Sequence, residues 1–380
     1  MTREPTYQAA RTAAAAIAAH FAQHHAEARR RGERDLAHAP DAATIETIID
    51  AAFWASFRPE EGRFPKISLS FLSPEEARQP LMLEHRLPLT PATLTKLAPA
   101  VERPGIHLGV WRDNDGVHIW GATRSVPSLG FVLEDVEPGL LVIKHRRIDG
   151  FGKFANIAVL KGEQVKIVDE QGASLPDCPD LIESLSSFTA PATWDDSVNV
   201  LVQLAASMRA HGHGGTLLIV PAGVEKWRES IVHPVTYSVS PPFSKLAHLL
   251  QETPSAAAEA EWQLSVRSAT EAVAGLTAVD GATVVTNQYE VLAFGVKIRR
   301  AAGSEPAEQV MLTEAIVGNQ AQVVPPVQHG GTRHLSAAQF IYDQHDALAL
   351  VASQDGRFTV FAWSPCEQMV HAHRVDVLLL

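Results

Sequence analysis

The sequence contains little cysteine and no long apolar run. Only Cys178 and Cys366 occur among 380 residues, and they do not form a Cys-x-x-Cys pair. This usage excludes a disulfide framework and a thiolate zinc site, and it fits a reducing compartment. The Ala-rich stretch 9–19 is shorter than the roughly 18 apolar residues of a membrane span, and Arg11 interrupts it. We therefore predict a cytoplasmic protein with two free thiols and no membrane partner.

Positive charge is also scarce. The chain has 32 Lys and Arg residues against 43 Asp and Glu residues, which gives a formal net charge of −11. Non-specific nucleic-acid binding depends on clustered Lys and Arg, so no nucleic-acid polymer is expected as a partner. The composition, 46% hydrophobic and 20% charged, is that of a packed globular protein with two or three domains. A small basic pocket is still compatible with it.

The common nucleotide-binding signatures are missing. No Gly-x-x-x-x-Gly-Lys-Ser/Thr sequence occurs, and the glycines at 212, 214 and 215 precede an apolar strand instead of following one. This excludes the P-loop and dinucleotide-binding folds. The run Gly150-Phe151-Gly152-Lys153 imitates a protein-kinase glycine loop, but neither His-Arg-Asp nor Asp-Phe-Gly follows it. We interpret that run as a turn before an ordinary strand.

A polar segment beginning at Gly330 is the most informative stretch of the chain. Gly330 and Gly331 are followed by Thr332, Arg333 and His334, just before an apolar helical pattern. A hydroxyl, a guanidinium and an imidazole suit a phosphate group. A helix that begins near His334 would add its free N–H groups and the positive end of its dipole. An Arg-His pair at a helix start is, however, more often a solvated cap.

A carboxylate lies about fifty residues upstream, in Asp280-Gly281-Ala282, at the entrance to a strand. A carboxylate together with a phosphate-binding segment is what a metal-nucleotide site requires. Asp-Gly before a strand is, by itself, more often only a turn. The hypothesis of a site therefore depends on the order of the segments and not on one motif.

That order resembles the diadenylate cyclase domain. The family is marked by Asp-Gly-Ala and, after a hairpin and a loop, by Gly-x-Arg-His-Arg. The matching residues here are Asp280-Gly281-Ala282 and Gly331-Thr332-Arg333-His334-Leu335. The helix-to-strand step at Gly214-Gly215 and a closing hairpin over 347–361 also resemble the family. The resemblance covers about residues 196–363.

The resemblance implies that each domain binds one ATP and that two domains meet face to face in a homodimer or a higher homo-oligomer. Each 3′ hydroxyl would attack the other α-phosphorus, which yields cyclic di-AMP. Asp280 would bind Mg²⁺ or Mn²⁺ and the ribose hydroxyl, and Gly281 and Ala282 would allow close backbone approach. Thr332, Arg333 and His334 would hold the phosphates, with Asp280, Arg333 and His334 as the catalytic group. The remaining expected substrate contacts are Gly214, Gly215, Gly331, Ser353 and Gln354.

Two positions depart from the family pattern. Leu335 replaces its second arginine, and Gln354 replaces a glutamate that many relatives carry. Losing one electrostatic contact to a transition state lowers the rate by about a hundredfold or more. Three hypotheses therefore stay open: an active cyclase, a degenerate cyclase fold that binds ATP or a cyclic nucleotide as a sensor, and an unrelated α+β scaffold.

The predicted fold class is α+β, with a C-terminal mixed, twisted sheet flanked by helices and a separate α+β domain before it. The predicted domains are residues 1–190, 195–365 and a C-terminal tail strand, 366–380. The first domain resembles a predicted sensor domain called DACNV, and it begins with helices over 7–34 and 42–54. On the first helix, adjacent His24 and His25 point about 100° apart and are expected in solvent. His371 and His373 would share one face of the tail strand.

Overall fold

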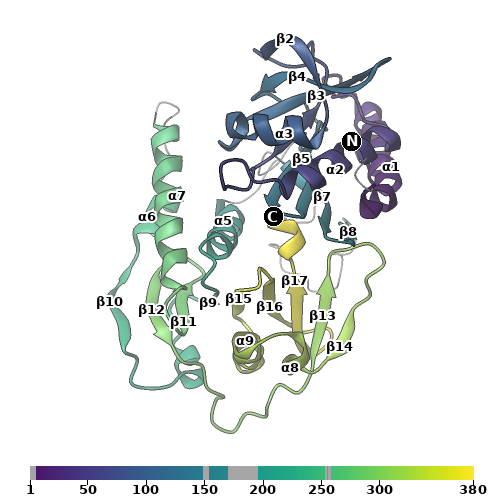
Figure 1. The fold of residues 1–380 in the computed structure, drawn as a ribbon. Helices are drawn as coiled ribbons and strands as arrows, with labels where there is room; N and C mark the ends of the chain where they lie inside the picture. Colours follow the sequence, from purple (N-terminus) through teal and green to yellow (C-terminus); the bar gives the residue numbers. More distant parts are fainter. Residues whose placement is uncertain (1–5, 149–153, 170–195, 253–254, 256–257) are drawn as a thin grey trace. The chain divides into compact units, whose positions relative to one another are not determined.

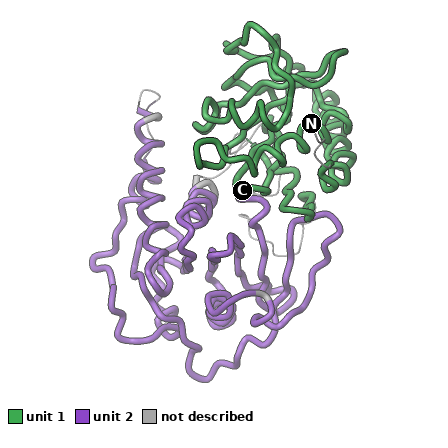
Figure 2. Tube along the Cα trace, in the orientation of Figure 1, with its two compact units in different colours: residues 1–169, 188–192, 380 green, residues 170–187, 193–379 purple. Residues whose placement is uncertain are grey.

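The computed structural model describes residues 6–148, 154–169, 196–252, 255 and 258–380 (Figure 1). The described residues 6–169 belong to one compact unit and 196–379 to a second, as Figure 2 colours them. Each unit is α+β and contains one mixed sheet. The predicted interdomain boundary, Cys178 and the glycine run 150–153 lie outside the described residues. Within the described ranges, no helix combines the length and the apolar character needed to cross a membrane.

An eight-stranded sheet in the order β2-β4-β3-β1-β5-β6-β7-β8 forms the first unit. The strands are β1 (Ser68–Phe71), β2 (Leu81–Pro88), β3 (His107–Asp113), β4 (Gly116–Thr123), β5 (Phe131–Glu137), β6 (Leu140–Arg146), β7 (Phe154–Lys161) and β8 (Gln164–Ile167). The helices are α1 (Gln8–Arg30), α2 (Ala42–Ser56), α3 (Pro91–Leu97) and η1 (Ala98–Val101). The hairpin turn predicted at Asp113–Gly116 is confirmed, since these two residues pair at the β3–β4 end. Asp41 caps α2 by accepting from Thr44 N at 2.7 Å.

Helix α1 buries a broader face than its sequence suggested. His24 and His25 are only 8% and 4% exposed, so the prediction that they lie in solvent is wrong. Alanines on α1 let the helix pack closely over a wide arc, and two adjacent positions both fall inside that arc. The rings of His24 and His145 lie 5.6 Å apart. In the part of the chain that the structure describes, no three histidine, cysteine or acidic side chains gather as metal ligands.

The second unit is built on a nine-stranded sheet, ordered β10-β12-β11-β9-β15-β16-β17-β13-β14. Its strands are β9 (Gly215–Val220), β10 (Tyr237–Phe243), β11 (Ala282–Thr286), β12 (Val291–Val296), β13 (Val310–Glu314), β14 (Gln322–Val324), β15 (Leu348–Ala352), β16 (Phe358–Ser364) and β17 (Met369–Arg374). Its helices are α5 (Asp196–Ala210), η2 (Lys226–Ser230), α6 (Lys245–Gln251), α7 (Glu259–Leu276), α8 (Pro326–His329), α9 (Thr332–Asp343) and η3 (Asp376–Leu378).

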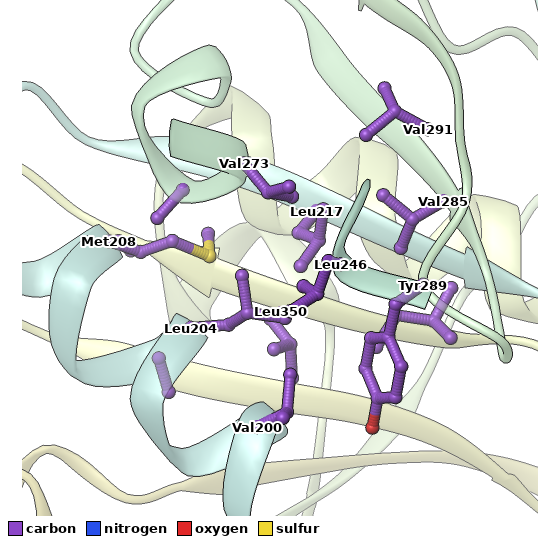
Figure 3. Packing of buried hydrophobic residues seen from close by; sticks show 14 of the residues in the cluster. Val200, Leu204, Met208, Leu217, Leu246, Val273, Val285, Tyr289, Val291 and Leu350 are labelled. Carbon is purple, nitrogen blue, oxygen red and sulfur yellow. The ribbon is translucent and has the colours of Figure 1, made fainter. Parts of the chain in front are cut away.

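Strand β9 lies inside this sheet, between β11 and β15, as its uninterrupted apolar sequence predicted. Alternate residues of β9 face opposite cores. Leu217 and Ile219 pack with α5, α6 and α7, whereas Leu218 and Val220 pack with α9. Figure 3 shows Leu217 among the buried side chains of the first of these cores. Helices therefore cover both faces of the sheet, and its ends are left for loops.

Several segments differ from the sequence predictions. The apolar residues over 231–239 predict a strand there, but the strand β10 begins only at Tyr237 and continues through Pro241 and Pro242, and Ile231 makes an isolated bridge. Prolines are tolerated there because β10 is an edge strand with a single partner, β12. The tail expected from 366 contributes β17, which lies between β16 and β13. His371 and His373 are both buried in it, and Cys366 is an exposed free thiol.

Because β17 is an internal strand, a charged side chain at one of its buried positions should destabilise the second unit. Ala372 is fully buried and packs in the core beneath α9. We expect Ala372→Asp to lower the stability by about 3 kcal/mol or more, since a buried carboxylate without a partner is strongly unfavourable. The control Glu367→Ala, at an exposed turn before β17, should change it by less than about 0.5 kcal/mol. Calorimetric melting of the full chain measures both, and equal melting temperatures would contradict an internal β17.

Candidate functional site

The β11–β12 hairpin brings a carboxylate and an amine together. Ala282 pairs with Val296, so Asp280, just before β11, and Lys297, just after β12, lie at the same open end of the hairpin. Lys297 Nζ is 2.6 Å from Asp280 Oδ2. Gly281 has φ +121°, and a Cβ there would lie 2.5 Å from the carbonyl carbon of Gly295. Only glycine therefore fits between Asp280 and the strand.

Helix α9 supplies the opposite side of the site. It begins at Thr332, two residues earlier than predicted, with Gly331 as an extended N-cap. The first turn of a helix leaves N–H groups without intrahelical partners and carries the positive end of the dipole. Arg333 belongs to this turn, and its guanidinium makes no hydrogen bond or ion pair with another described residue. The start of α9 thus offers an uncommitted positive group and free backbone donors.

These two elements line one pocket of about 520 Å³. Its lining includes eight of the eleven predicted site residues: Asp280, Gly281, Ala282, Gly331, Thr332, Arg333, His334 and Ser353. The segments around 280 and 332, distant in the sequence, therefore converge on a single cavity. The other lining residues, which the sequence analysis missed, are Thr216, Val296, Lys297, Ile298 and Ser336.

Three predicted residues, Gly214, Gly215 and Gln354, are not among the described residues that line the pocket. Gly214 has φ +70°, and a Cβ there would lie 3.0 Å from an Arg333 guanidinium nitrogen, so its lack of a side chain makes room for Arg333. Gly215 packs against Thr277. Gln354 donates from Nε2 to the carbonyl oxygen of His213 at 3.2 Å. These residues support the position of Arg333 and of the loops beside it.

His334 is a neutral group in this site. It is 3% exposed, and its Nε2 lies 3.3 Å from Thr359 Oγ1. The pKa of His334 is lowered to about 4, chiefly by burial, because the charge of Asp355, which raises it, is opposed by the charges of Arg374, Arg357 and Arg333. At neutral pH the imidazole therefore offers a hydrogen bond and not a positive charge.

The charge of the pocket comes instead from Arg333 and Lys297. Hydrogen bonding and the positive charge of Lys297 lower the pKa of Asp280, and Arg333 contributes less. Asp280 is thus ionised at neutral pH, with its side chain 91% exposed. One carboxylate faces two cations and a helix N-terminus, which favours an anionic ligand.

Lys297 could have been found from the sequence through the register of the hairpin. A residue that precedes the first strand of a hairpin lies beside the residue that follows the second strand. The apolar runs 282–286 and 291–296, separated by a short polar turn, predict such a hairpin, and its register places residue 297 beside residue 280. Strand register also explains why Thr216 lines the pocket. Strand β9 runs parallel to β11, and Thr216 pairs with Ala282 at the start of both strands.

The comparison with known families identifies part of the first unit. The model of a probable sensor domain, DACNV, matches residues 34–124. This confirms the sensor-domain resemblance over those 91 residues of the first unit, whereas the cyclase resemblance of the second unit remains a prediction. None of the curated proteins compared with the sequence matches it.

Solved structures give partial similarities. A hypothetical membrane spanning protein from Bacillus cereus is 16% identical with a TM-score of 0.27, over 47% of this chain and 63% of that one. The match thus spans less than two thirds of the Bacillus protein. A double mutant of DacA from Staphylococcus aureus is 12% identical with a TM-score of 0.23, over 47% of this chain and 85% of that one.

The neutral state of His334 predicts a pH dependence of stability. The pKa is about 4 in the folded protein and about 6.5 when unfolded, so the unfolded chain binds the extra proton between these values. The lowered pKa of His334 therefore contributes fully to the free energy of unfolding above pH 6.5. This contribution is lost as the pH falls toward 4, at up to about 1.4 kcal/mol per pH unit. We expect His334→Gln to reduce the fall in melting temperature between pH 7 and pH 4.5.

The matched control is His248→Gln, which removes an exposed imidazole from α6. It should leave the pH dependence of melting as it is in the parent protein. A parent-like profile for His334→Gln would mean that folding does not lower the pKa of His334, which would contradict its assignment as a buried neutral group.

Proposed function

We propose that the second unit binds ATP in the pocket between Asp280 and Arg333 and condenses two ATP molecules to cyclic di-AMP. The observation that carries this proposal is the convergence of the two segments in one pocket of about 520 Å³. Its volume lies in the range of small-molecule sites. The match of residues 34–124 in the first unit to a probable sensor domain, DACNV, supports a protein related to diadenylate cyclases.

In this proposal the triphosphate lies at the start of α9. Arg333 forms charge-assisted bonds to the phosphates, and the backbone N–H groups of Thr332 and Arg333 add two further donors. Lys297 provides a second cation from the other side of the pocket. Asp280 faces the ribose hydroxyl, and Gly281 lets the nucleotide approach the backbone. Most of the rate enhancement then comes from positioning and from neutralising charge.

A divalent cation could bind at this pocket only when the nucleotide supplies further oxygen ligands. Among the described residues that line the pocket, Asp280 is the one acidic side chain, so these residues by themselves offer a single carboxylate. Mg²⁺ is commonly held by one or two carboxylates together with substrate phosphates, and Mn²⁺ favours similar oxygen ligands. Asp280 and the triphosphate oxygens would hold it, and it would neutralise charge on the phosphates. Lys297 would then turn from Asp280 toward the phosphates.

The chemistry requires two copies of the site. The 3′ oxygen of one ATP forms a bond to the α-phosphorus of the other, the bond to pyrophosphate breaks, and the hydroxyl proton leaves to solvent or to a carboxylate. A second attack closes the ring and releases the second pyrophosphate. Because each pocket holds one nucleotide in this proposal, two domains must meet face to face as a homodimer.

A product assay tests the proposal. Purified protein incubated with ATP and Mn²⁺ or Mg²⁺ should yield cyclic di-AMP by mass spectrometry, and Asp280→Asn should lower the rate about a hundredfold or more. The control is Asp346→Asn, an exposed carboxylate outside the pocket, which should retain full activity. An equal rate in Asp280→Asn would contradict the assignment.

The ion pair between Lys297 and Asp280 favours a second candidate, a nucleotide sensor without turnover. Lys297 occupies one oxygen of the only acidic side chain that lines the pocket, at 2.6 Å. Leu335 is an apolar, 40% exposed residue where the resembled family has an arginine. A pocket with these features can bind a triphosphate or a cyclic dinucleotide through Arg333 while it lacks groups needed for the reaction.

Binding without turnover has its own signature. ATP at about 100 times its dissociation constant should stabilise the second unit by about 2.7 kcal/mol, which raises the melting temperature. Arg333→Gln should remove most of this shift, and the control Arg300→Gln, an exposed arginine outside the pocket, should keep it. A shift with no cyclic di-AMP identifies a sensor. No shift with ATP or cyclic di-AMP would contradict both candidates.

A further inference from the structure

A second cavity lies in the first unit, inside the segment that matches the sensor domain. It has a volume of about 310 Å³ and is lined by Gln79, Leu81, Leu83, Leu97, Ala100, Ile106, Leu108, Gly121, Ala122, Thr123 and Arg124. All of these residues fall within the matched range 34–124. The nucleotide proposal uses none of them.

The floor of this cavity is a row of side chains across three strands. Leu81 of β2 pairs with Ala122 of β4, and Ala122 pairs with Leu108 of β3, so the three share one face of the sheet. Alanine in the middle of the row leaves the space that a larger residue would fill. Leu97 and Ala100, from α3 and η1, form a wall.

Polar groups gather at one end of the cavity. Gln79 comes just before β2 and Arg124 just after β4, and these strands are antiparallel, so both residues lie at the same end. Arg124 is the only charged residue among the lining residues that the structure describes. Neither side chain makes a hydrogen bond or an ion pair with a residue that the structure describes. The cavity is thus apolar along its length and cationic at its mouth.

We propose that this cavity binds a small amphipathic acid, with an apolar body of on the order of ten heavy atoms and one carboxylate. The apolar body lies on the row of Leu81, Ala122 and Leu108, and the carboxylate meets Arg124 and Gln79. Charge complementarity favours an anion over a neutral or cationic amphiphile. This inference concerns the first unit and does not depend on the chemistry of the second.

Binding of decanoate to the full chain tests the proposal. Isothermal titration below the micellar concentration should show one saturable site, and 1-decanol should bind more weakly. Arg124→Gln should weaken decanoate binding about tenfold, because it removes a charged hydrogen-bond donor, and should leave decanol binding unchanged. The matched control Arg103→Gln removes an exposed arginine outside the cavity and should change neither affinity.

A second variant tests the location of the site. Ala122→Phe fills the floor of the cavity and should abolish binding of both probes. A photoreactive decanoate analogue needs no variant, and it should label peptides within residues 79–124. No saturable binding, or labelling elsewhere in the chain, would overturn the proposal.

A second copy of the chain is the competing occupant, because β2 is an edge strand with Leu81 and Met82 exposed. In that case, Met82→Glu would turn a dimer into a monomer in light scattering, and decanoate would not bind the dimer. That outcome would also overturn the proposal.

Discussion

The candidate site depends on the pairing of β11 with β12. A hairpin with Ala282 opposite Val296 fixes the residues that flank its open end, so Asp280 and Lys297 meet whatever the rest of the chain does. Gly281 makes this approach possible, since a side chain there would overlap the backbone of Gly295. The grouping of Asp280, Lys297 and Arg333 in one pocket follows from this hairpin once α9 is fixed opposite to it.

The orientation of α9 depends on the sheet in turn. Phe340 and Ile341 are fully buried against the face formed by β9, β15 and β16, which holds the axis of the helix and directs its first turn at the pocket. The ligand would lie at the amino ends of the parallel strands β9 and β11. Doubly wound folds bind nucleotides at the carboxyl ends of their strands, so this pocket represents a different use of a mixed sheet.

Strong local patterns were predictable from the sequence. The apolar run of β9, the hairpin of β11 and β12 and the convergence of 280 with 332 all follow from periodicity, turn chemistry and motif order. Features set by tertiary packing were not. Strand β2 has no apolar alternation because most of it is exposed at a sheet edge. His24 is buried because it belongs to the wide, Ala-rich face of α1 that packs against the rest of the unit. The neutral state of His334 depends on burial that no local pattern encodes.

The balance of charge in the pocket bears on the departure at Leu335. The resembled family carries two arginines at the start of the helix, and here only Arg333 is present there. Lys297 restores a second cation, but from the hairpin instead of the helix. Lysine is a compact, flexible point charge, whereas arginine holds a phosphate in a fixed bidentate geometry. In the proposed function, Arg333 and Lys297 therefore hold the substrate from two sides. The distance between α9 and the hairpin, rather than one helix alone, then fixes the position of the substrate. Any motion that changes that distance would alter phosphate binding directly.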